Sequence, residues 1–322
     1  MTEISNTQFA GLDANQAFVT AVTTGTEVFD LGRPLFRGMP QSPNHPQFRM
    51  LLERRHGDII RADGSSAANE LIVTGGHVGT HIDALCHVSF EGKLHGGVDA
   101  ARALSGGRFA ALGVETIEPM VRRGIMLDIP AALGIDECRP GYEVTPDDLA
   151  AAAAGQGTQP QPGDVILIRT GWGRHFDEGE AYLGASSGVP GPAEDAARWL
   201  AGRQPVAVGA DSIAFEQIPA GRGHALLPAH RILLVEAGIY ILEALELEQL
   251  ASAQAHEFVF VCAPLKLLGA TGSPVRPLAL TVRERGLCRH PPVSPSTSTS
   301  CRRWRRWPRP RGGGTRGSAA AQ

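Results

Sequence analysis

Apolar and polar residues follow one another in short blocks along the chain, and these blocks predict an alternation of strands and helices. The continuous run Val165-Ile166-Leu167-Ile168 lies between Gly163 and Gly171 and is typical of a strand that is buried on both faces. We expect this strand at residues 164–170. A strand pattern also occurs at residues 27–31, 48–54, 70–74, 124–129, 206–210, 239–242 and 257–262.

Helices are expected between these strands. Thr145-Pro146-Asp147-Asp148 carries the start signals of a helix, namely a capping Thr, a Pro at the first helical position and an acid at the third. The segments 192–200 and 228–237 also show a helical pattern. This alternation predicts an α/β fold, a single compact domain with a central mixed sheet that is at least partly parallel.

Composition and charge separate the ends of the chain from its body. The chain has 322 residues, of which 43% are hydrophobic, which is enough for a sizeable core. Its net charge is -3, but residues 283–322 hold ten Arg and one Glu, so the remainder carries 20 basic and 32 acidic residues. An acidic body argues against nucleic-acid binding. We expect a polar leader at 1–25, one folded domain at 26–282 and a separate basic tail at 283–322.

The tail has the composition of a disordered segment. A Ser/Thr/Pro run leads into Cys301-Arg302-Arg303-Trp304, and such a sequence cannot bury enough apolar surface to offset the entropy lost on ordering. Two interpretations remain open. The tail could be an arm that binds nucleic acid or a membrane surface, or a non-native extension such as the translation of GC-rich DNA in a shifted frame, and the composition favours the second.

Targeting signals are missing from the pattern of the chain. We find no run of about 18 apolar residues, which a transmembrane helix would require. The first fifteen residues lack the basic and apolar regions of a signal peptide. Five widely spaced cysteines indicate a reducing compartment rather than a disulfide framework. We therefore expect a cytoplasmic protein that binds neither membranes nor nucleic acid.

Three histidines and an aspartate fall within eleven residues, as His77, His81, Asp83 and His87. Imidazole nitrogens and carboxylate oxygens suit Zn, Mn or Fe(II), and a catalytic site needs three protein ligands and an open position. Gly75, Gly76 and Gly79 allow the tight backbone turns that this would require. The alternative is a set of solvated or core histidines, but four suitable groups among glycines favour a metal site.

A short helix is expected to begin at Thr80, because Thr80-His81-Ile82-Asp83 has the form of a capping box. In such a helix Asp83 and His87, four residues apart, share one face. One of them could then hold the ion while the other faces the substrate. Cys86 would point away from His87, so we interpret it as a buried structural residue.

A second cluster is expected to complete the site. His230 lies in the helix predicted to begin near Pro228, and Glu243 follows the apolar strand 239–242, at the carboxyl end where α/β sheets bind ligands. His224 and Glu236 lie in the same stretch, and spacing alone does not decide between these pairs. For the wall of a pocket that binds an aromatic or cyclic substrate, the apolar candidates are Phe36, Met39, Trp172 and Phe215. Ordinary core packing is at least as good an explanation for each of them.

Two other catalytic classes receive little support. Gly184-Ala185-Ser186-Ser187-Gly188 fits the Gly-x-Ser-x-Gly string of serine hydrolases, but a nucleophile elbow needs a preceding strand and a following helix, and this segment has the composition of a loop. We find neither a Walker A loop nor a dinucleotide fingerprint, so nucleotide cofactors are not expected.

His77-Val78-Gly79-Thr80-His81-Ile82-Asp83, followed by His87, resembles the signature of the cyclase-like metal-dependent hydrolases, a family that includes bacterial kynurenine formamidase and isatin hydrolase. Shorter similar stretches run from about residue 27 to 280. They are Gly38-Met39-Pro40, Gly163-Asp164 with Arg169-Thr170-Gly171-Trp172, His230-Arg231-Ile232-Leu233-Leu234, and the segment from Ala270 to Pro277. The family has no counterpart of the tail after Val282.

The resemblance implies a compact α/β fold of the swivelling type and a homo-oligomer, a dimer or a tetramer. It also implies that His77, His81 and Asp83 bind a metal, that His230 and Glu243 complete a site for one or two ions, and that His87 transfers protons. The expected ion is Zn or Mn.

The expected activity is hydrolysis of an amide, a cyclic amide or a related carbonyl C–N or C–O bond in a small aromatic or cyclic substrate. Metal-bound hydroxide would attack the carbonyl, and His87 would act as general acid and base. The alternatives are a lactone hydrolase, a lyase or dehydratase that uses the same ion, and a metal-binding module without catalysis.

Overall fold

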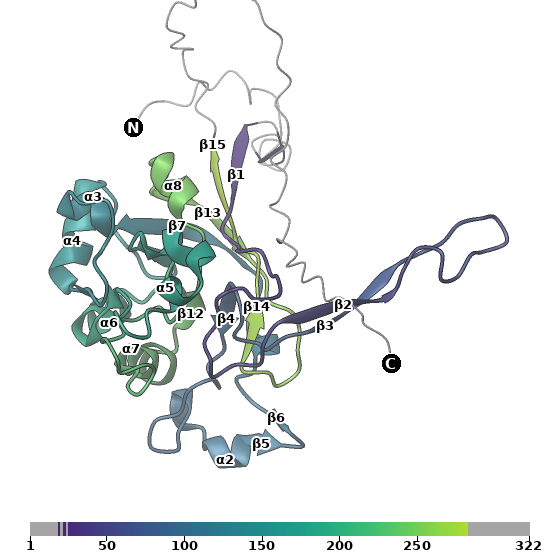
Figure 1. Cartoon of the computed structure of the whole chain (residues 1–322). Helices are drawn as coiled ribbons and strands as arrows, with labels where there is room; N and C mark the ends of the chain where they lie inside the picture. Colours follow the sequence, from purple (N-terminus) through teal and green to yellow (C-terminus); the bar gives the residue numbers. More distant parts are fainter. Residues whose placement is uncertain (1–18, 20–21, 24, 283–322) are drawn as a thin grey trace, which may run out of the picture. The chain divides into compact units, whose positions relative to one another are not determined.

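The computed structural model describes residues 19, 22–23 and 25–282, and both the tail and most of the polar leader lie outside these residues. The body is an α/β domain built on a nine-stranded mixed sheet (Figure 1). In spatial order its strands are β1 (Thr26–Asp30), β15 (Leu278–Val282), β13 (Glu257–Cys262), β7 (Met120–Asp128), β9 (Val165–Arg169), β11 (Ala207–Ala210), β12 (Tyr240–Glu243), β4 (His81–Asp83) and β14 (Gly272–Pro274). The predicted fold class is therefore confirmed.

The four central strands β7, β9, β11 and β12 are parallel, and antiparallel strands extend the sheet on both sides. All five residues of β9 are buried, as the apolar run predicts. Ile166 and Ile168 belong to one hydrophobic core, whereas Val165 and Leu167 belong to a second. Side chains alternate across a strand, so the two cores lie on opposite faces of the sheet.

Helices cover the sheet. The first core includes residues of α3 (Ile129–Leu133), α4 (Pro146–Gly155) and α6 (Glu194–Ala201), and the second includes Leu250 of α8 (Glu248–Ser252). The helix start at Thr145 is confirmed, because Thr145 and Asp148 form a capping box there. Helix 228–237 begins as α7 (Pro228–His230) and continues as a π-helix, Arg231–Ala237. No helix of the described residues is long and apolar enough to cross a membrane.

Smaller elements complete the chain. An arm formed by β2 (Arg49–Arg54) and β3 (Asn69–Val73) projects from the body (Figure 1). The remaining helices and strands are α2 (Ala100–Ala103), β5 (Leu104–Ser105), β6 (Arg108–Phe109), β8 (Glu143–Val144), α5 (Glu180–Leu183) and β10 (Gly191–Pro192), with 3-10 turns at His95–Gly97, Val114–Thr116 and Trp172–Glu178.

The helix predicted from Thr80 is wrong, because His81–Asp83 form strand β4 between β12 and β14. The Thr80 hydroxyl does not cap a helix: it donates to the Ala244 carbonyl (2.7 Å) and accepts from the Arg33 amide (2.8 Å). Pairing with two neighbouring strands satisfies the backbone that a helix would otherwise have satisfied internally. Asp83 and His87 therefore do not share a helix face, and a turn after β4, closed by the His87 amide on the Ala84 carbonyl (2.9 Å), places His87.

Candidate active site and metal centre

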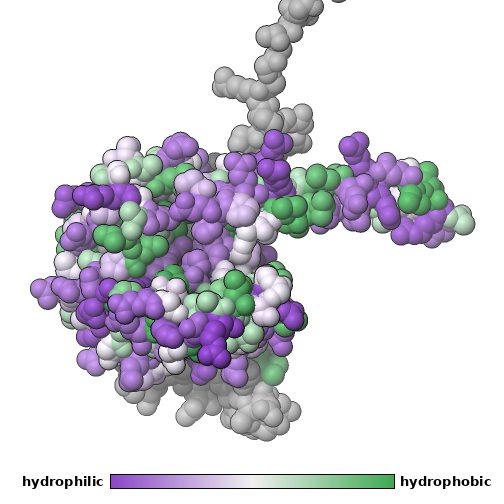
Figure 2. Space-filling view, turned by 90° about the horizontal axis from the view of Figure 1, so that it is seen from below, coloured by the Kyte–Doolittle hydropathy of each residue, from purple (hydrophilic) through white to green (hydrophobic). Residues whose placement is uncertain are grey.

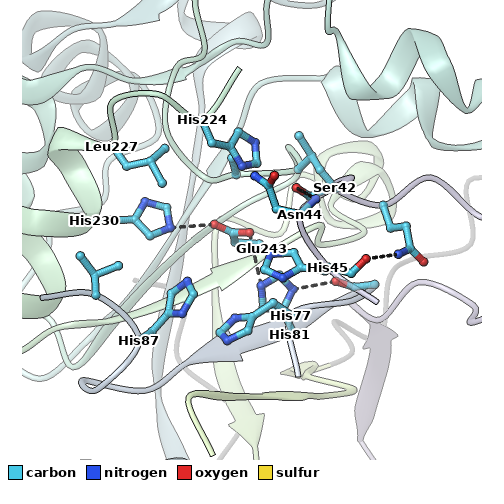
Figure 3. Close-up of a pocket in the computed structure, with 15 residues that line it drawn as sticks. Ser42, Asn44, His45, His77, His81, His87, His224, Leu227, His230 and Glu243 are labelled. Carbon is cyan, nitrogen blue, oxygen red and sulfur yellow. Dashed lines mark hydrogen bonds and ion pairs between the residues drawn. The ribbon is translucent and has the colours of Figure 1, made fainter. Parts of the chain in front are cut away.

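A cavity of about 250 Å³ lies beside strands β4 and β12 (Figure 3). Its apolar wall is formed by Val88, Ile213, Ala214 and Leu227. Its polar wall includes His45, His77, His81, His87, His224, His230 and Glu243. Histidines and carboxylates thus gather from four separate parts of the chain.

His77, Asp83 and His87 form the first group of ligand-type side chains. One nitrogen or oxygen of each lies within 4.8 Å of the others. His77 Nδ1 is 2.7 Å from Asp83 Oδ1, and His77 Nε2 is 2.8 Å from the Thr271 hydroxyl. The ring of His87 stacks on that of His77 with centroids 3.8 Å apart, and we find no hydrogen bond from the His87 ring to any described residue.

His81, Asp83 and Glu243 form the second group, and Asp83 is shared by both. Antiparallel pairing of β4 with β12 places His81 directly opposite Glu243. His81 Nδ1 is 2.9 Å from the Gly79 carbonyl, which only accepts, so this nitrogen carries the proton. The second nitrogen, Nε2, faces Glu243 Oε2 at 3.3 Å and Asp83 Oδ1 at 3.5 Å, and its lone pair becomes available to a cation when the proton on Nε2 leaves. A carbonyl that fixes the tautomer of a ligand histidine in this way is typical of metal sites.

His230 joins this group from the opposite side. Its Nε2 lies 3.1 Å from Glu243 Oε1 and 3.5 Å from Asp83 Oδ2. Its Nδ1 donates to Glu216 Oε1 (2.6 Å), and the same carboxylate accepts the backbone amides of Ala229 and His230 at 3.0 Å each. Glu216 therefore orients the ring so that Nε2 points into the cavity.

Asp83 Oδ2 is a buried oxygen that receives no hydrogen bond from the described residues, although His230 Nε2 is 3.5 Å away. A buried carboxylate oxygen without a partner costs free energy unless something else satisfies it. Three imidazoles and two carboxylates surround this point, and they are a suitable donor set for one or two divalent cations. The side chains present therefore fit a metal ion.

Protons on the histidines balance the negative charge of the buried carboxylates when no cation is bound. Burial favours neutral Glu243, but the hydrogen bonds from His230 and His81 outweigh it and lower the pKa of Glu243 to about 2. Burial likewise opposes charge on His81, yet the bond to Glu243 raises its pKa to about 9. Burial dominates at His87 and lowers its pKa to about 4. A divalent cation can replace the protons of the ligand histidines, since metal binding and proton release are coupled.

Glycines allow the close packing around His77. Gly79 has a φ of +68°, and a Cβ there would clash with the Leu35 side chain. A Cβ on Gly272 would meet the His77 ring, and one on Gly76 would meet the Gly272 carbonyl at 2.7 Å. The prediction that glycines permit tight turns in this segment holds at Gly79, and two further glycines allow the segment and β14 to approach closely.

The four residues predicted to form an apolar wall are not brought to the cavity. Met39 and Trp172 are buried in a separate core, where the Trp172 indole donates to the Tyr182 carbonyl (2.8 Å). Phe215 is fully buried against the sheet, and Phe36 contacts Phe176 edge to face. Core packing explains the positions of Met39, Trp172 and Phe215, as the alternative interpretation had it, whereas Phe36 is partly exposed and belongs to no core.

The other residues singled out in the sequence lie partly at the cavity and partly away from it. His224 lines the cavity, whereas Glu236 lies on the exposed surface and pairs with Arg198 and Arg231. Cys86 is buried, as expected. The segment from Gly184 to Gly188 is a loop between α5 and β10, so the nucleophile-elbow pattern is absent.

Sequence reasoning missed two residues of the site. His45 lies on the cavity wall and stacks on His77, with ring centroids 5.3 Å apart. It comes from the Pro-rich segment at residues 34–46, where a lone histidine gives no signal. Glu216 is separated by fourteen residues from His230, and only the fold brings the two together.

Comparisons of sequence and of structure with known proteins point to the same family. The sequence model of the family described as "Putative cyclase" matches residues 29–217. Isatin hydrolase of Roseibium aggregatum is 29% identical over 222 residues, which cover 68% of this chain and 77% of that protein. A crystal structure of a novel cyclase superimposes with a TM-score of 0.72 at 30% identity and covers 82% of this chain and 91% of its own.

A crystal structure of an isatin hydrolase bound to the product analogue thioisatinate superimposes with a TM-score of 0.64 at 25% identity, over 84% of this chain and all of its own. These relatives support a hydrolase of the cyclase-like type. With a family model that matches more than half of its length, and with the histidine signature folded into one buried centre, this chain belongs to the cyclase family.

Proposed function

We propose that this protein is a metal-dependent hydrolase that opens an amide, a cyclic amide or a related carbonyl C–N or C–O bond of a small aromatic or cyclic substrate. One observation carries the proposal. Ligand-type side chains from three parts of the chain converge on a buried Asp83 oxygen that receives no hydrogen bond from the described residues, at the wall of a 250 Å³ cavity. A group arranged for structure alone would be saturated by donors of the protein itself.

The ion would be held by His77, His81, Asp83, His230 and Glu243, as one or two ions of Zn²⁺ or Mn²⁺. Such an ion supplies two things when bound: it lowers the pKa of water from about 15.7 toward ~7, and it polarises a carbonyl oxygen. The protein orients the ligand histidines and fixes which ring nitrogen of each carries the proton. Gly79 fixes the tautomer of His81, and Glu216 fixes that of His230.

His87 is the residue that moves protons. Its ring lies on the cavity wall, stacked on His77, and is engaged by no hydrogen bond from the described residues. It takes a proton from the attacking water and returns it to the leaving nitrogen or oxygen, a transfer that typically contributes ~10²–10⁴-fold. Three other cavity histidines have assigned partners: His81 and His230 are committed to Gly79 and Glu216 through Nδ1, and His77 contacts Asp83 and Thr271 through its two nitrogens.

The size and lining of the cavity favour a small substrate with an apolar body. About 250 Å³ lies below the ~300–1,000 Å³ of sites for drug-sized ligands. Val88, Ile213, Ala214 and Leu227 can contact a ring while the polar wall faces its carbonyl. Two of the relatives described above are isatin hydrolases, and one of these is bound to thioisatinate, so a fused ring with a cyclic amide is the first substrate class to test.

Metal analysis followed by product analysis tests the proposal. The purified protein, loaded with Mn²⁺ or Zn²⁺, is incubated with isatin, N-formyl aromatic amines, cyclic imides and lactones, and the products are identified by mass spectrometry. We expect gain of one water by at least one substrate, lost on chelation and restored by metal. A protein that binds the ion stoichiometrically but adds water to none of the four classes would refute the hydrolase.

A further inference from the structure

His224 lines the cavity but takes no part in the centre at Asp83. It forms neither a hydrogen bond nor an ion pair with another residue that the structure describes, and it belongs to neither group of ligand-type side chains. Its side chain is half-buried at the wall of the cavity, so it is partly shielded from bulk water without being covered. A polar group in that position lacks a protein partner and is available to a ligand.

The loop that carries His224 is held in one conformation. Gly221 and Gly223 have φ values of +69° and +50°, and a side chain at either position would strain the backbone although the space around it is open. The Gly221 amide donates to the Ala185 carbonyl (3.1 Å), which fixes the loop to the segment after α5. The loop ends at Pro228, where α7 begins. The backbone of this loop therefore sets the position of His224 at the cavity.

Asn44 offers a second hydrogen-bond donor on the same wall. Figure 3 shows His224 and Asn44 on the side of the cavity away from His87. The Asn44 side-chain amide has no hydrogen bond with a described residue, and only the backbone amide is engaged, by the Ser42 hydroxyl (3.4 Å). The cavity of about 250 Å³ is on the order of 8 Å wide, so a ring bound at the metal centre also reaches this wall.

This wall suits a neutral group on the ligand and not an anion. Burial lowers the pKa of His224 below its ordinary value of 6.5, so the imidazole is neutral at pH 7 and donates through one nitrogen. Hydrophilic residues cover much of the outer face of the body (Figure 2), but no Lys or Arg is among the described residues that line the cavity. A carboxylate or a phosphate would find no cationic side chain on this wall, whereas a carbonyl oxygen would find two neutral donors.

We propose that His224 and Asn44 hold a second carbonyl oxygen of the substrate while the centre at Asp83 receives the carbonyl that is hydrolysed. This assignment rests on the proposed function and narrows its substrate class to small rings that carry two neutral carbonyl groups. His224 is then a specificity-determining residue, since it contacts the substrate and takes no part in proton transfer. A single neutral hydrogen bond of this kind changes affinity by about tenfold.

Three ketones that have no bond to hydrolyse test the assignment on the metal-loaded protein by titration calorimetry. They are acetophenone with one carbonyl, meta-diacetylbenzene with two, and meta-acetylbenzenesulfonate, whose second group is an anion. The wild type should bind meta-diacetylbenzene about tenfold more tightly than acetophenone, and the sulfonate no more tightly than acetophenone.

Variants of the loop assign this preference to His224. His224→Leu should remove it, and His224→Gln should keep part of it, because glutamine still has a donor. Arg222→Ala is the matched control, since Arg222 is exposed on the same loop and does not line the cavity, and it should bind all three ketones as the wild type does. Metal analysis accompanies His224→Leu, and a loss of bound metal would make His224 a ligand and overturn the assignment.

The other outcomes are equally decisive. Equal or undetectable binding of the first two ketones to the wild type, tighter binding of the sulfonate, or an unchanged preference in folded His224→Leu would each overturn the assignment. If His224→Leu does not fold, the ring signals of His224 in NMR spectra of the wild type decide, because they should shift with meta-diacetylbenzene and not with acetophenone. No ketone is turned over, so a protein that shows the preference but hydrolyses no substrate would refute the hydrolase alone.

Discussion

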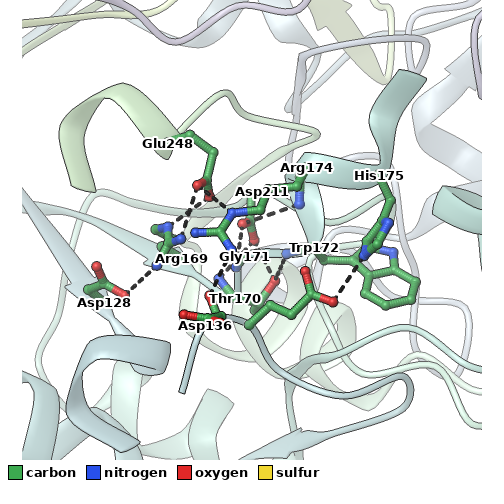
Figure 4. Close-up of polar contacts among 12 residues, drawn as sticks. Asp128, Asp136, Arg169, Thr170, Gly171, Trp172, Arg174, His175, Asp211 and Glu248 are labelled. Carbon is green, nitrogen blue, oxygen red and sulfur yellow. Dashed lines mark hydrogen bonds and ion pairs between the residues drawn. The ribbon is translucent and has the colours of Figure 1, made fainter. Parts of the chain in front are cut away.

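Two buried polar groups in this molecule resemble each other in composition and differ in how their hydrogen bonds are satisfied. One surrounds Asp83 beside the cavity whose lining residues are drawn in Figure 3, and the other surrounds Arg169 and Asp211 near the end of β9 (Figure 4). Asp83 and Asp211 are both fully buried. The difference between them separates a site that can bind a ligand from a group that only holds the fold.

The group at Arg169 is saturated by protein atoms. Arg169 donates to Asp128 Oδ1 (2.7 Å) and makes a two-bond contact with Glu248 (2.8 and 3.0 Å), and Arg174 adds a bond to the same Glu248 (2.7 Å). Asp211 accepts from the Thr170 hydroxyl (2.6 Å) and amide (3.0 Å) and from the Gly171 amide (2.9 Å). Each carboxylate faces donors that the fold itself supplies, so the group is structural.

The group at Asp83 has the opposite character. Within the part of the chain that the structure describes, its Oδ1 receives one close bond, from His77, and its Oδ2 receives none. The neighbours are another carboxylate, Glu243, and imidazoles whose Nε2 atoms point inward. Here carboxylates face histidine nitrogens that can exchange their protons for a cation, whereas the donors at Arg169 cannot be exchanged. This is why only the group at Asp83 is a metal centre in our proposal.

The largest effect is expected from Asp83→Asn. The variant should lose its bound divalent ion and, with it, several kcal/mol of transition-state stabilisation, or ~10³-fold in turnover. Excess metal at 100 times the dissociation constant should stabilise the wild type by ~2.7 kcal/mol and leave the variant unchanged. Elemental analysis and thermal denaturation with and without a chelator measure both effects. Full metal retention in the variant would remove Asp83 from the centre.

His87→Ala sharpens the assignment within the metal centre. If His87 moves protons, the variant should keep its metal and lose at least ~10²-fold in kcat. If His87 is a ligand, as its distance to His77 and Asp83 also allows, metal occupancy falls and excess metal restores the rate. His256→Ala, which changes a histidine that does not line the cavity, serves as the control. Full occupancy with near-normal turnover would refute both roles.

The fold was predictable where local patterns and burial agree. The apolar run at Val165 gives β9, and the capping residues at Thr145 give α4. The failure at Thr80 has a physical cause, since a capping-box sequence was overridden by strand pairing on both sides of His81–Asp83. A local signal of ~1 kcal/mol cannot outweigh two rows of strand contacts whose partners lie some 160 and 190 residues away.

The site was predictable from chemistry that is close in sequence and not from chemistry that only folding assembles. The histidine signature places three ligand-type residues together because seven residues span them. Glu216 and His45 were missed, since each is a single common residue with no local pattern. The expected wall of Phe36, Met39, Trp172 and Phe215 did not form at the cavity, because three of these large apolar residues pack in the core instead, and Phe36 lies at the surface.

Asp211→Asn tests the structural group. The variant loses one acceptor oxygen and places a donor beside backbone amides, so the free energy of unfolding should fall by about 2 kcal/mol. The loss should be the same with and without a chelator, unlike that of Asp83→Asn. Urea denaturation in both conditions provides the measurement. A loss that disappears when the metal is removed would show that the two groups are coupled and would break the distinction between them.

The smallest effect on stability is expected from Glu248→Gln, and the pH dependence of this effect tests the role of the Glu248 charge. Partial burial of Glu248 raises its pKa, but the hydrogen bonds from Arg169 and Arg174 outweigh this and lower the pKa below the ordinary value of 4.5. A carboxylate with a lowered folded-state pKa stabilises the protein above its unfolded pKa, and this contribution is lost as the pH falls through the folded value.

Because Glu248 is only half-buried, the difference between the wild type and Glu248→Gln should be no more than about 1 kcal/mol. It should be complete at pH 6–7, shrink below about pH 4.5 and vanish in stronger acid. Urea midpoints between pH 7 and pH 3 measure it, with the exposed Glu236→Gln as a control that should change stability by less than ~0.5 kcal/mol. A difference that stays constant down to pH 3 would mean that Glu248 acts through packing. In that case, hydrogen bonds from charged donors to the carboxylates would not explain the difference between the Arg169 group and the centre at Asp83.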